Sequence, residues 1–513
     1  MLPPWFSFRT HCSICGTSQS GKSKFCEHCM REHVIAGNGF CLIDWHGTLY
    51  QAMLEFLAYV CPDRPIILLN PSDPTYIRPF NPFRLPSGGE VTSHAIRLAE
   101  MLIKPWGAEN TNELPTYERI VKMVLTFMAV SGEPLHHAAK LLELPKKELR
   151  EYAVSLIEDD YIKQQWKQLQ YVHSLTEWRR QVESTQNRLG RFIGSRSVKL
   201  FTGLPGDALD INKAIEDKAI VLVNLKPSAM LPDESGRVFA SLLLSEFLHA
   251  ALNHTDEERP YFLYLDEAQN YLTGDAAKML DQVLKTGLRL SLAFHHMGQF
   301  HDNLHLQQSL ETNAKIEVVF AGLPAYAAKE TAERFFMPEL NERWIKEVRY
   351  RTVTKHYEEP YETTTESEGN TSSDGMVGEQ ESSSHGKSAS SSTVSGTRFV
   401  PYYEQEETGK DEWSRDEKVS KLAQRLMSLP RQHCYVKLPD DVFAYKVPCV
   451  DEYLMYPETV LRFEKALQRT AIPLHEAEQI LKERERVFLE RSREYERGPG
   501  RPKKKPPTLH PQR

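Results

Sequence analysis

Residues 16–23 read Gly-Thr-Ser-Gln-Ser-Gly-Lys-Ser and match the pattern G-x-x-x-x-G-K-[ST] in full. The segment before them, 6–15, is strand-like, and the segment after them, 22–36, is typical of a helix. A glycine-rich turn between a strand and a helix offers backbone N–H groups and a positive helix end to a phosphate. Gly16 and Gly21 permit a backbone path that a Cβ would obstruct. The stretch therefore predicts an α/β fold built around a phosphate-binding loop, or P-loop.

The loop predicts a nucleotide site whose cofactors are ATP and Mg²⁺. Lys22 is expected to neutralise charge on the β- and γ-phosphates, and the Ser23 hydroxyl is expected to ligate Mg²⁺. The backbone of the whole loop is expected to bind the phosphates: Gly16, Thr17, Ser18, Gln19, Ser20, Gly21, Lys22 and Ser23. The simpler alternative is a surface turn rich in serine and glycine.

A pair of carboxylates is expected to complete the site. Residues 261–267 read YFLYLDE, an apolar strand that ends in two acids. Asp266 is predicted to hold Mg²⁺ in the Walker B role, and Glu267 to orient and deprotonate the attacking water. The alternative is a pair of solvated loop carboxylates, which the complete P-loop disfavours.

The next predicted strand, 288–294, supplies candidates for two further roles. Polar groups after this strand would lie beside the γ-phosphate, and Gln299 is our first choice as the residue that senses it, with His295 second. Arg289, with Lys285 as a second candidate, is proposed as the finger that reaches the ATP of a neighbouring subunit. Surface-loop positions are the alternative for all of them.

Composition places these motifs in a protein of several units. The 513 residues are 40% hydrophobic and 26% charged, which is enough to bury a core. The net charge of −7 requires any DNA contact to come from local patches. We find no signal peptide and no long uncharged apolar run, so a cytoplasmic protein without a membrane span is expected.

Shifts in pattern along the chain divide it into segments. The expected segments are 1–90, the first part of the ATPase core with the P-loop; 91–195, an all-α insertion; 196–361, the second part of the core with Walker B; 362–397, a disordered linker rich in Ser, Thr and Gly; 398–460, a return to the core; and 461–513, a charged helix and a basic tail.

Four cysteines overlap the P-loop and raise a different hypothesis. Cys12, Cys15, Cys26 and Cys29 form a C-x₂-C-x₁₀-C-x₂-C pattern that taken alone indicates zinc. Residues 12 and 15 of one strand point to opposite faces, however, so a single tetrahedral site is awkward. A non-catalytic, zinc-bearing DNA-binding scaffold stays open as an alternative from a different functional class.

The sequence resembles the coupling-protein ATPases of conjugative type IV secretion systems, within the HerA/FtsK superfamily of DNA-pumping motors. The resemblance spans most of residues 6–445 and rests on blocks in one order. The blocks are RTHCSICGTSQSGKS, CLIDWHGTLY, ILLNPSDPTYIRPFNPF, NRLGRFIGSRSVKLFTG, AIVLVNLKPS, FLYLDEAQNYLT, LAFHHMGQF and SLPRQHCYVKLP.

The resemblance implies a RecA-like P-loop NTPase core of the ASCE type, an all-α insertion, a homo-hexameric ring and ATP-driven movement of DNA. It implies a relaxase and a membrane secretion complex as partners. Two blocks depart from the family pattern: Asp-Trp-His-Gly at 44–47 replaces Asp-Pro-His-Gly, and His295 stands where the family has Gln. No anchor precedes the P-loop here, so docking to a membrane is expected to come from a partner. The same engine could instead move protein or package a genome.

The tail after residue 499 is a candidate DNA contact. Residues 500–505 read Gly-Arg-Pro-Lys-Lys-Lys and resemble the core of an AT-hook, although Pro499 replaces the usual preceding Arg. The candidate phosphate-binding residues are Arg501, Lys503, Lys504 and Lys505. A solubilising basic terminus is the alternative.

Overall fold

The computed structural model describes residues 10–85, 89–103, 115–144, 146–172, 174–205, 209–253, 259–272, 277, 280–301, 303–371, 386–450 and 456–497. The chain divides into two compact units. One comprises Met1–Phe335 with Leu422–Arg513, and the other comprises Phe336–Lys421.

A nine-stranded sheet forms the centre of the first unit, in the order β12-β11-β8-β1-β7-β6-β2-β5-β3. The strands are β1 Cys12–Cys15, β2 Phe40–Asp44, β3 Ile66–Leu69, β5 Ile220–Asn224, β6 Tyr261–Leu265, β7 Leu288–Phe294, β8 Ile316–Phe320, β11 His433–Lys437 and β12 Val442–Lys446. The seven from β8 to β3 run parallel, and β11 and β12 join antiparallel. The parallel strands are short, nearly continuous apolar segments, as expected for strands whose two faces are both covered by helices.

One strand, β7, separates β1, which precedes the P-loop, from β6, which precedes Asp266 and Glu267. Cys15 at the end of β1 is paired with Phe294, and Leu265 at the end of β6 is paired with Leu292. The carboxyl ends of all three strands therefore meet at one edge of the sheet. A single strand between the P-loop strand and the strand that carries the acids is the order expected for an ASCE-type P-loop NTPase.

Helices cover both faces of this sheet. On one face, α1 Lys22–Ala36, α2 Thr48–Val60 and α17 Pro457–Leu467 contribute to a single apolar core with the strands. On the other, Phe247 of α11 Asp233–Asn253 stacks on Tyr261 of β6, with ring centroids 5.9 Å apart. The remaining helices around the sheet are α10 Ile211–Glu216, α13 Leu304–Asn313 and α14 Ala325–Phe335.

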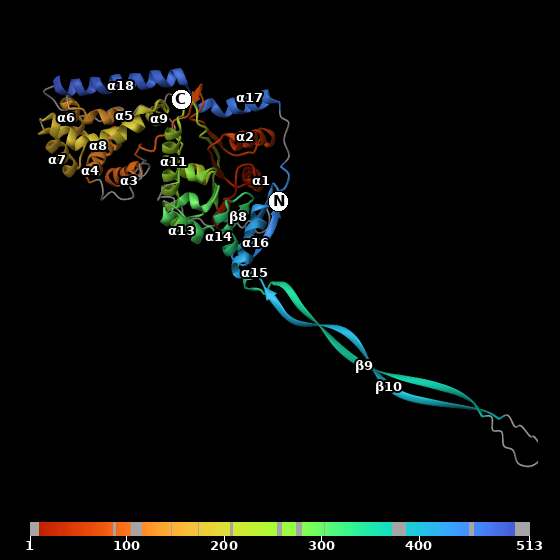
Figure 1. Ribbon diagram of the computed structural model, residues 1–513. Coiled ribbons are helices and arrows are strands. Elements are labelled where there is room, and N and C mark those ends of the chain that lie inside the picture. The colour runs from red at the N-terminus through yellow and green to blue at the C-terminus, as the bar shows by residue number, and fades with distance from the viewer. Residues whose placement is uncertain are drawn as a thin grey trace, which may run out of the picture. The chain divides into compact units, whose positions relative to one another are not determined.

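The helical insertion forms a cluster with its own core, in which Trp166, Phe127 and Phe192 are fully buried. Its helices are α3 Val91–Ile103, α4 Pro115–Ser131, α5 Leu135–Ala138, α6 Lys147–Leu156, α7 Asp160–Gln170, α8 Leu175–Gly194 and α9 Arg196–Gly203. The C-terminal helix α18 Leu474–Arg497 packs along α6 and α9 (Figure 1). No helix within the described ranges is long and apolar enough to cross a membrane.

The C-terminal helix is held on the insertion by directed contacts. The Arg484 guanidinium donates to the carbonyl of Gly203 at 2.6 Å and to that of Gly132 at 2.8 Å. Phe488 stacks on His137, with centroids 5.3 Å apart. A two-stranded pair of β4 Tyr76–Ile77 and β13 Ile472–Pro473 precedes α18. The partner of this charged helix is therefore the chain's own insertion.

The second unit is dominated by a long antiparallel hairpin of β9 Ile345–Thr371 and β10 Gly386–Glu412 (Figure 1). It also holds α15 Met337–Asn341, and α16 Arg415–Met427 begins in it. At the base of the hairpin, Trp413 donates its backbone N–H to the Trp344 carbonyl at 2.9 Å. Lys421 lies over the Trp413 ring, with Nζ 3.5 Å from its centroid.

Two expectations about this region are wrong. Residues 362–371 and 386–397 are paired strand and not a flexible linker, because the antiparallel ladder pairs the backbone N–H and C=O groups of the two strands. Residues 372–385 of the expected linker lie outside the described ranges. The return to the core does not begin at residue 398, since 398–412 belong to β10; it is β11 and β12 that rejoin the sheet.

Candidate active site

The P-loop runs between the end of β1 and the start of α1. Gly16 N–H donates to the His295 carbonyl at 3.0 Å, and Thr17 N–H donates to the Ala321 carbonyl at 3.2 Å. These two bonds tie the loop to the segments that follow β7 and β8. A Cβ on Gly16, whose φ is 152°, would lie 2.6 Å from the Cβ of Phe320. Glycine is therefore required there by both space and backbone angle.

The first turn of α1 points its amide groups out of the helix end. The first helical bond is donated by Phe25 N–H to the Gly21 carbonyl at 3.0 Å, so the amides of Lys22, Ser23 and Lys24 have no partner within the helix. Gly21, with φ 125°, is the residue before the helix. Ser23 is exposed, and Gln19 in the loop has a positive φ of 64°. This arrangement suits an anion.

Lys22 is nearly buried and lies among groups of opposite charge. Its Nζ donates to the Gly16 carbonyl at 2.5 Å and to the Thr17 carbonyl at 3.2 Å. Burial lowers the pKa of Lys22, and the carboxylates of Glu267 and Asp266 oppose that shift. The side chain therefore turns back onto its own loop, at the place where it would meet phosphate oxygens.

Asp266 and Glu267 follow β6 at the same edge of the sheet. Asp266 is 4% exposed, and burial together with the charges of Asp44 and Glu267 raises its pKa to about 8. Its backbone N–H donates to the Ile43 carbonyl at 3.0 Å, which ties the turn to β2. Glu267 adopts a left-handed conformation, with φ 49°, that turns its carboxylate away from the strand direction. A buried carboxylate with a raised pKa needs a cation to hold its charge.

His295 bridges the lysine and the glutamate. Its Nε2 lies 3.2 Å from Glu267 Oε2, and its Nδ1 lies 3.4 Å from Lys22 Nζ. Gln299 is in a different position: its Oε1 accepts the backbone N–H of His295 at 2.9 Å and that of His296 at 3.3 Å. Gln299 thus holds the turn after β7, and His295 is the group that faces the carboxylate. Of the two candidates for the sensing role, His295 is the one that lies beside Glu267 and Lys22.

Comparison with solved structures places this geometry in a known fold. The unbound "Bacterial conjugative coupling protein TrwBdeltaN70" is 13% identical, with a TM-score of 0.53, and the match covers 87% of this chain and 86% of that one. TrwB in complex with ADP and Mg²⁺ is 13% identical, with a TM-score of 0.52 and 87% of each chain covered. Its complex with a non-hydrolysable ATP analogue, ADPNP, is 12% identical, with a TM-score of 0.53 and the same coverage.

The chain has the coupling-protein fold. No family model matches it, and no curated protein matches it in sequence. The expected α/β P-loop core with a helical insertion is confirmed.

Three residues of the candidate site were not predicted from the sequence. Asp44 ends β2, is fully buried, and accepts the backbone N–H groups of His46 at 2.9 Å and Tyr50 at 2.8 Å. His46 Nε2 lies 3.8 Å from Glu267 Oε1. Trp45 stacks on Tyr271, with centroids 5.7 Å apart. The available signal was an acid at the end of an apolar strand, the same signal that identified Asp266.

Trp45 supports the turn after β6 through Tyr271. The Tyr271 hydroxyl donates to the backbone carbonyl of Asp266 at 2.8 Å. Trp45 is therefore a packing partner of the residue that holds this turn.

Arg289 does not fit the role of a finger. It is 5% exposed, its Nη1 donates to the Leu288 carbonyl at 3.2 Å, and its register partner is Phe262 at the amino end of β6. A guanidinium buried at that end cannot extend to a neighbour's phosphate. Lys285, in the short helix η5 Val283–Thr286, is exposed and stays the candidate of the two.

The four cysteines are packed and do not form a metal site. Cys12, Cys26 and Cys29 belong to the apolar core, whereas Cys15 lies on the opposite side of β1. Burial raises the pKa of each of the four thiols, that of Cys15 to about 12, so the thiolates that zinc requires are disfavoured. Within the described residues, no group of three His, Cys, Asp or Glu side chains could hold a metal.

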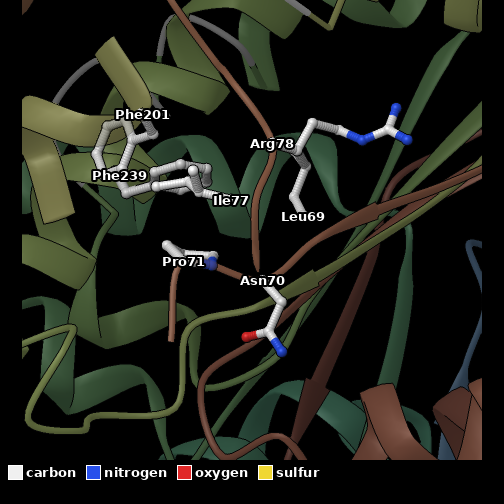
Figure 2. Close-up of a pocket in the computed structure, with 7 residues that line it drawn as sticks. All are labelled: Leu69, Asn70, Pro71, Ile77, Arg78, Phe201 and Phe239. Carbon is white, nitrogen blue, oxygen red and sulfur yellow. The ribbon is translucent and has the colours of Figure 1, made fainter. Parts of the chain in front are cut away.

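One further feature, a small pocket, lies away from the phosphate loop. The pocket, at the carboxyl end of β3, is lined by Leu69, Asn70, Pro71, Ile77, Arg78, Phe201 and Phe239 (Figure 2). Its Arg78 donates to Thr470 Oγ1 at 2.6 Å and so serves the packing of the C-terminal segment. The candidate DNA-binding residues Arg501, Lys503, Lys504 and Lys505 lie outside the described ranges.

Proposed function

We propose that this chain is a Mg²⁺-dependent ATPase that drives DNA through a ring of its own copies during conjugative transfer. The observation that carries the proposal is the meeting of Lys22, His295 and Glu267 at the carboxyl edge of adjacent parallel strands. A glycine-lined phosphate loop, a lysine and two acids in this order are the parts that phosphoryl transfer to water requires.

The residues present fit a magnesium-bound triphosphate. The Gly16 cradle has no room for a Cβ, and the first amides of α1 are oriented out of the helix end. Ser23 is exposed beside them, and Asp266 is a buried acid whose raised pKa a divalent cation would lower. Bound MgATP supplies the scissile phosphate and the countercharge for this acid. Ser23 and Asp266 are the proposed magnesium ligands.

Each of the chain's own groups has a separate task in the proposed reaction. Lys22 leaves its loop carbonyls and neutralises the phosphate oxygens. Glu267 orients a water and accepts its proton, and His295 holds the Glu267 carboxylate at its Oε2. His295 contacts both Lys22 and Glu267, so a change at the lysine is transmitted to the base. Lys285 is the proposed contact to a neighbour's nucleotide.

The DNA part of the proposal is supported by the fold and by the printed name of the solved neighbour, a conjugative coupling protein. A hexameric ring, a relaxase and a membrane secretion complex as partners, and a cytoplasmic location belong to the same proposal. Pore contacts in such a ring would be directed to phosphates and would depend little on sequence. The basic residues Arg501, Lys503, Lys504 and Lys505 are proposed as additional phosphate contacts.

The test is ATP hydrolysis with and without DNA, in the wild type and in Glu267→Gln. We expect DNA to stimulate the wild type and Glu267→Gln to lose turnover by about 10²- to 10⁴-fold while it still binds MgATP. Glu330→Gln, at an exposed position on α14, is the matched control and should hydrolyse normally. Lys22→Ala should lose binding itself.

Two results would contradict the proposal. Normal turnover in Glu267→Gln would remove the base from its role. Hydrolysis that is stimulated by protein substrates and not by DNA would indicate a motor for protein.

A further inference from the structure

The β9–β10 hairpin separates its charges by strand. At its base, residues 345–355 of β9 carry four cations and one anion, and residues 404–412 of β10 carry five anions and one cation. Towards the turn the pattern reverses: residues 356–371 of β9 carry five anions and no Lys or Arg, and residues 386–403 of β10 carry two cations and no Asp or Glu. From base to turn, β9 changes from basic to acidic, and β10 changes from acidic to basic. At each level of the hairpin the two strands therefore carry opposite charges.

Most charged side chains at the base already have a partner in the same chain, among them Lys346 with Glu417 and Lys410 with Glu407. Lys355 Nζ lies 2.6 Å from Glu404 and 3.0 Å from Glu406, and Arg349 Nη2 lies 2.6 Å from Asp411. The same strands also present their outer edges, one basic and one acidic at the base. If the outer edge of β9 in one copy met the outer edge of β10 in another copy, a basic segment would again face an acidic one.

The hairpin has little of its own to stabilise it. Among its exposed apolar side chains are Tyr403 at 76%, Phe399 at 66%, Val394 at 59% and Tyr350 at 58%. An isolated two-stranded hairpin is marginally stable in water, and three or more strands are needed for independent stability. Exposed aromatic side chains on a strand gain from a cross-strand neighbour. A further strand at either edge would supply the third strand and a cross-strand neighbour for the aromatic side chains.

Prolines limit where such pairing can occur. Pro360 in β9 and Pro401 in β10 each remove a backbone donor, and proline in a strand is tolerated where its missing N–H faces the edge. Both lie beyond the base segments 345–355 and 404–412, in which no proline occurs. The base segments are therefore the part of each edge that can accept a neighbour, and they are also the most highly charged.

We propose that the basic base segment of β9 in one copy pairs, antiparallel, with the acidic base segment of β10 in a second copy of this chain. The two hairpins then point the same way, and each copy uses one edge for each neighbour. This head-to-tail contact continues from copy to copy, and like-charged β9–β9 or β10–β10 contacts between hairpins of the same direction are excluded. The contact goes beyond the proposed ATPase and does not depend on ATP hydrolysis.

The test is disulfide formation between co-expressed full-length chains. One chain carries Gln405→Cys on β10 and the other carries Thr352→Cys on β9; both positions are exposed, and the exposed Cys61 and Cys449 are replaced by serine in both chains. Directly opposed residues on neighbouring strands are close enough for a disulfide. A cysteine at position 403 or 407 of β10, used in place of Gln405→Cys, detects the same contact if the two strands are shifted by two residues. Glu330→Cys in place of Thr352→Cys is the control and should not cross-link.

Charge exchange makes the test specific for contacts between copies. An all-acidic hairpin carries Arg349→Glu, Arg351→Glu and Lys355→Glu. An all-basic hairpin carries Glu404→Lys, Glu406→Lys and Asp411→Lys. Each set alone should cross-link at least about fivefold less than the wild type, because like charges then face each other. An all-acidic chain with Gln405→Cys and an all-basic chain with Thr352→Cys should recover the yield when mixed.

Recovery in the mixture cannot come from repair within a hairpin, since each hairpin keeps its like charges. It also shows that neither set merely unfolds. No cross-link in the wild type would overturn the proposal, and so would an unchanged yield in either set alone or no recovery in the mixture. The experiment is run without nucleotide, so its failure leaves the ATPase proposal standing.

Discussion

His295 lies between two charged residues of the candidate site. Its imidazole contacts Lys22 through Nδ1 and Glu267 through Nε2, while Gln299 holds the backbone of the same turn. One ring therefore connects Lys22, the proposed phosphate-binding lysine, with the proposed base. A second histidine, His46, approaches the other oxygen of Glu267 from the end of β2.

We expect His295→Ala to lower kcat by about 10- to 100-fold with little change in KM, because the base loses its orientation and the phosphate loop does not change. His295→Gln should recover part of the rate, since an amide can still donate to Glu267. Steady-state kinetics separates the two constants. Equal losses in His295→Ala and His295→Gln would show that the ring has only a packing role.

A buried histidine predicts how stability depends on pH. His33 Nε2 lies 2.9 Å from the Tyr264 hydroxyl, the ring stacks on Phe262 at 3.9 Å, and burial lowers its pKa from 6.5 to about 3. Between these values the unfolded chain binds a proton that the folded chain excludes. The stability is therefore lost as pH falls below about 6.5, by about 1.4 kcal/mol per pH unit for one such residue.

We expect His33→Phe, which keeps the stack, to lose less Tm than the wild type between pH 7 and pH 5 in calorimetric scans. His475→Gln changes an exposed histidine on α18 and should follow the wild type. A His33→Phe profile parallel to that of the wild type would contradict this account.

At the scale of the element, α18 shows how a charged helix can have a structural partner. Burial lowers the pKa of Arg484, whose guanidinium satisfies carbonyls at the ends of α9 and α4. We expect Arg484→Ala to destabilise the fold by about 2 kcal/mol, because two charge-assisted bonds are lost. Arg486 on the same helix pairs with Glu483 and Glu490 in solvent, so Arg486→Ala should change little. Thermal unfolding and limited proteolysis of α18 measure the stability of the two variants. Equal losses of stability in Arg484→Ala and Arg486→Ala would show that the Arg484 bonds do not hold α18 in place.

At the scale of the whole molecule, the candidate site and the hairpin belong to different units. The phosphate loop, β6 and β7 lie in the first unit, and both long strands lie in the second. Ile345 and Glu412 are paired at the base of the hairpin, so a short linker can join the chain there.

We expect replacement of residues 346–411 by a Gly-Ser linker to leave the Kd for MgATP within about twofold of the wild type, because each group in the candidate site comes from the first unit. Fluorescent-nucleotide titration measures it. A matched replacement within the P-loop, Gly16→Ala, should abolish binding. Loss of binding on excision, with an unchanged Tm, would show that the hairpin contributes to the site.

The P-loop and the two acids were predictable because their signals are local. A glycine pattern between a strand and a helix specifies a phosphate cradle by backbone geometry alone, and an acid after a buried strand lies at a sheet edge. Asp44 carries the same local signal, but its relevance depends on β2 lying next to β6, which no local pattern states. Arg289 was misassigned for the same reason: its burial at the amino end of β7 follows from the register.

The sequence by itself determined the α/β class and the presence of a helical insertion, and it indicated the phosphate loop and the two acids, because short-range backbone and burial patterns encode each of them. Tertiary structure alone decided that His295 and not Gln299 faces Glu267, that α18 binds the insertion, and that the Ser- and Thr-rich segment forms strands. Those outcomes depend on pairing between residues far apart in the chain. A single-chain pattern does not record such pairing, since strand order and register are set by the whole fold.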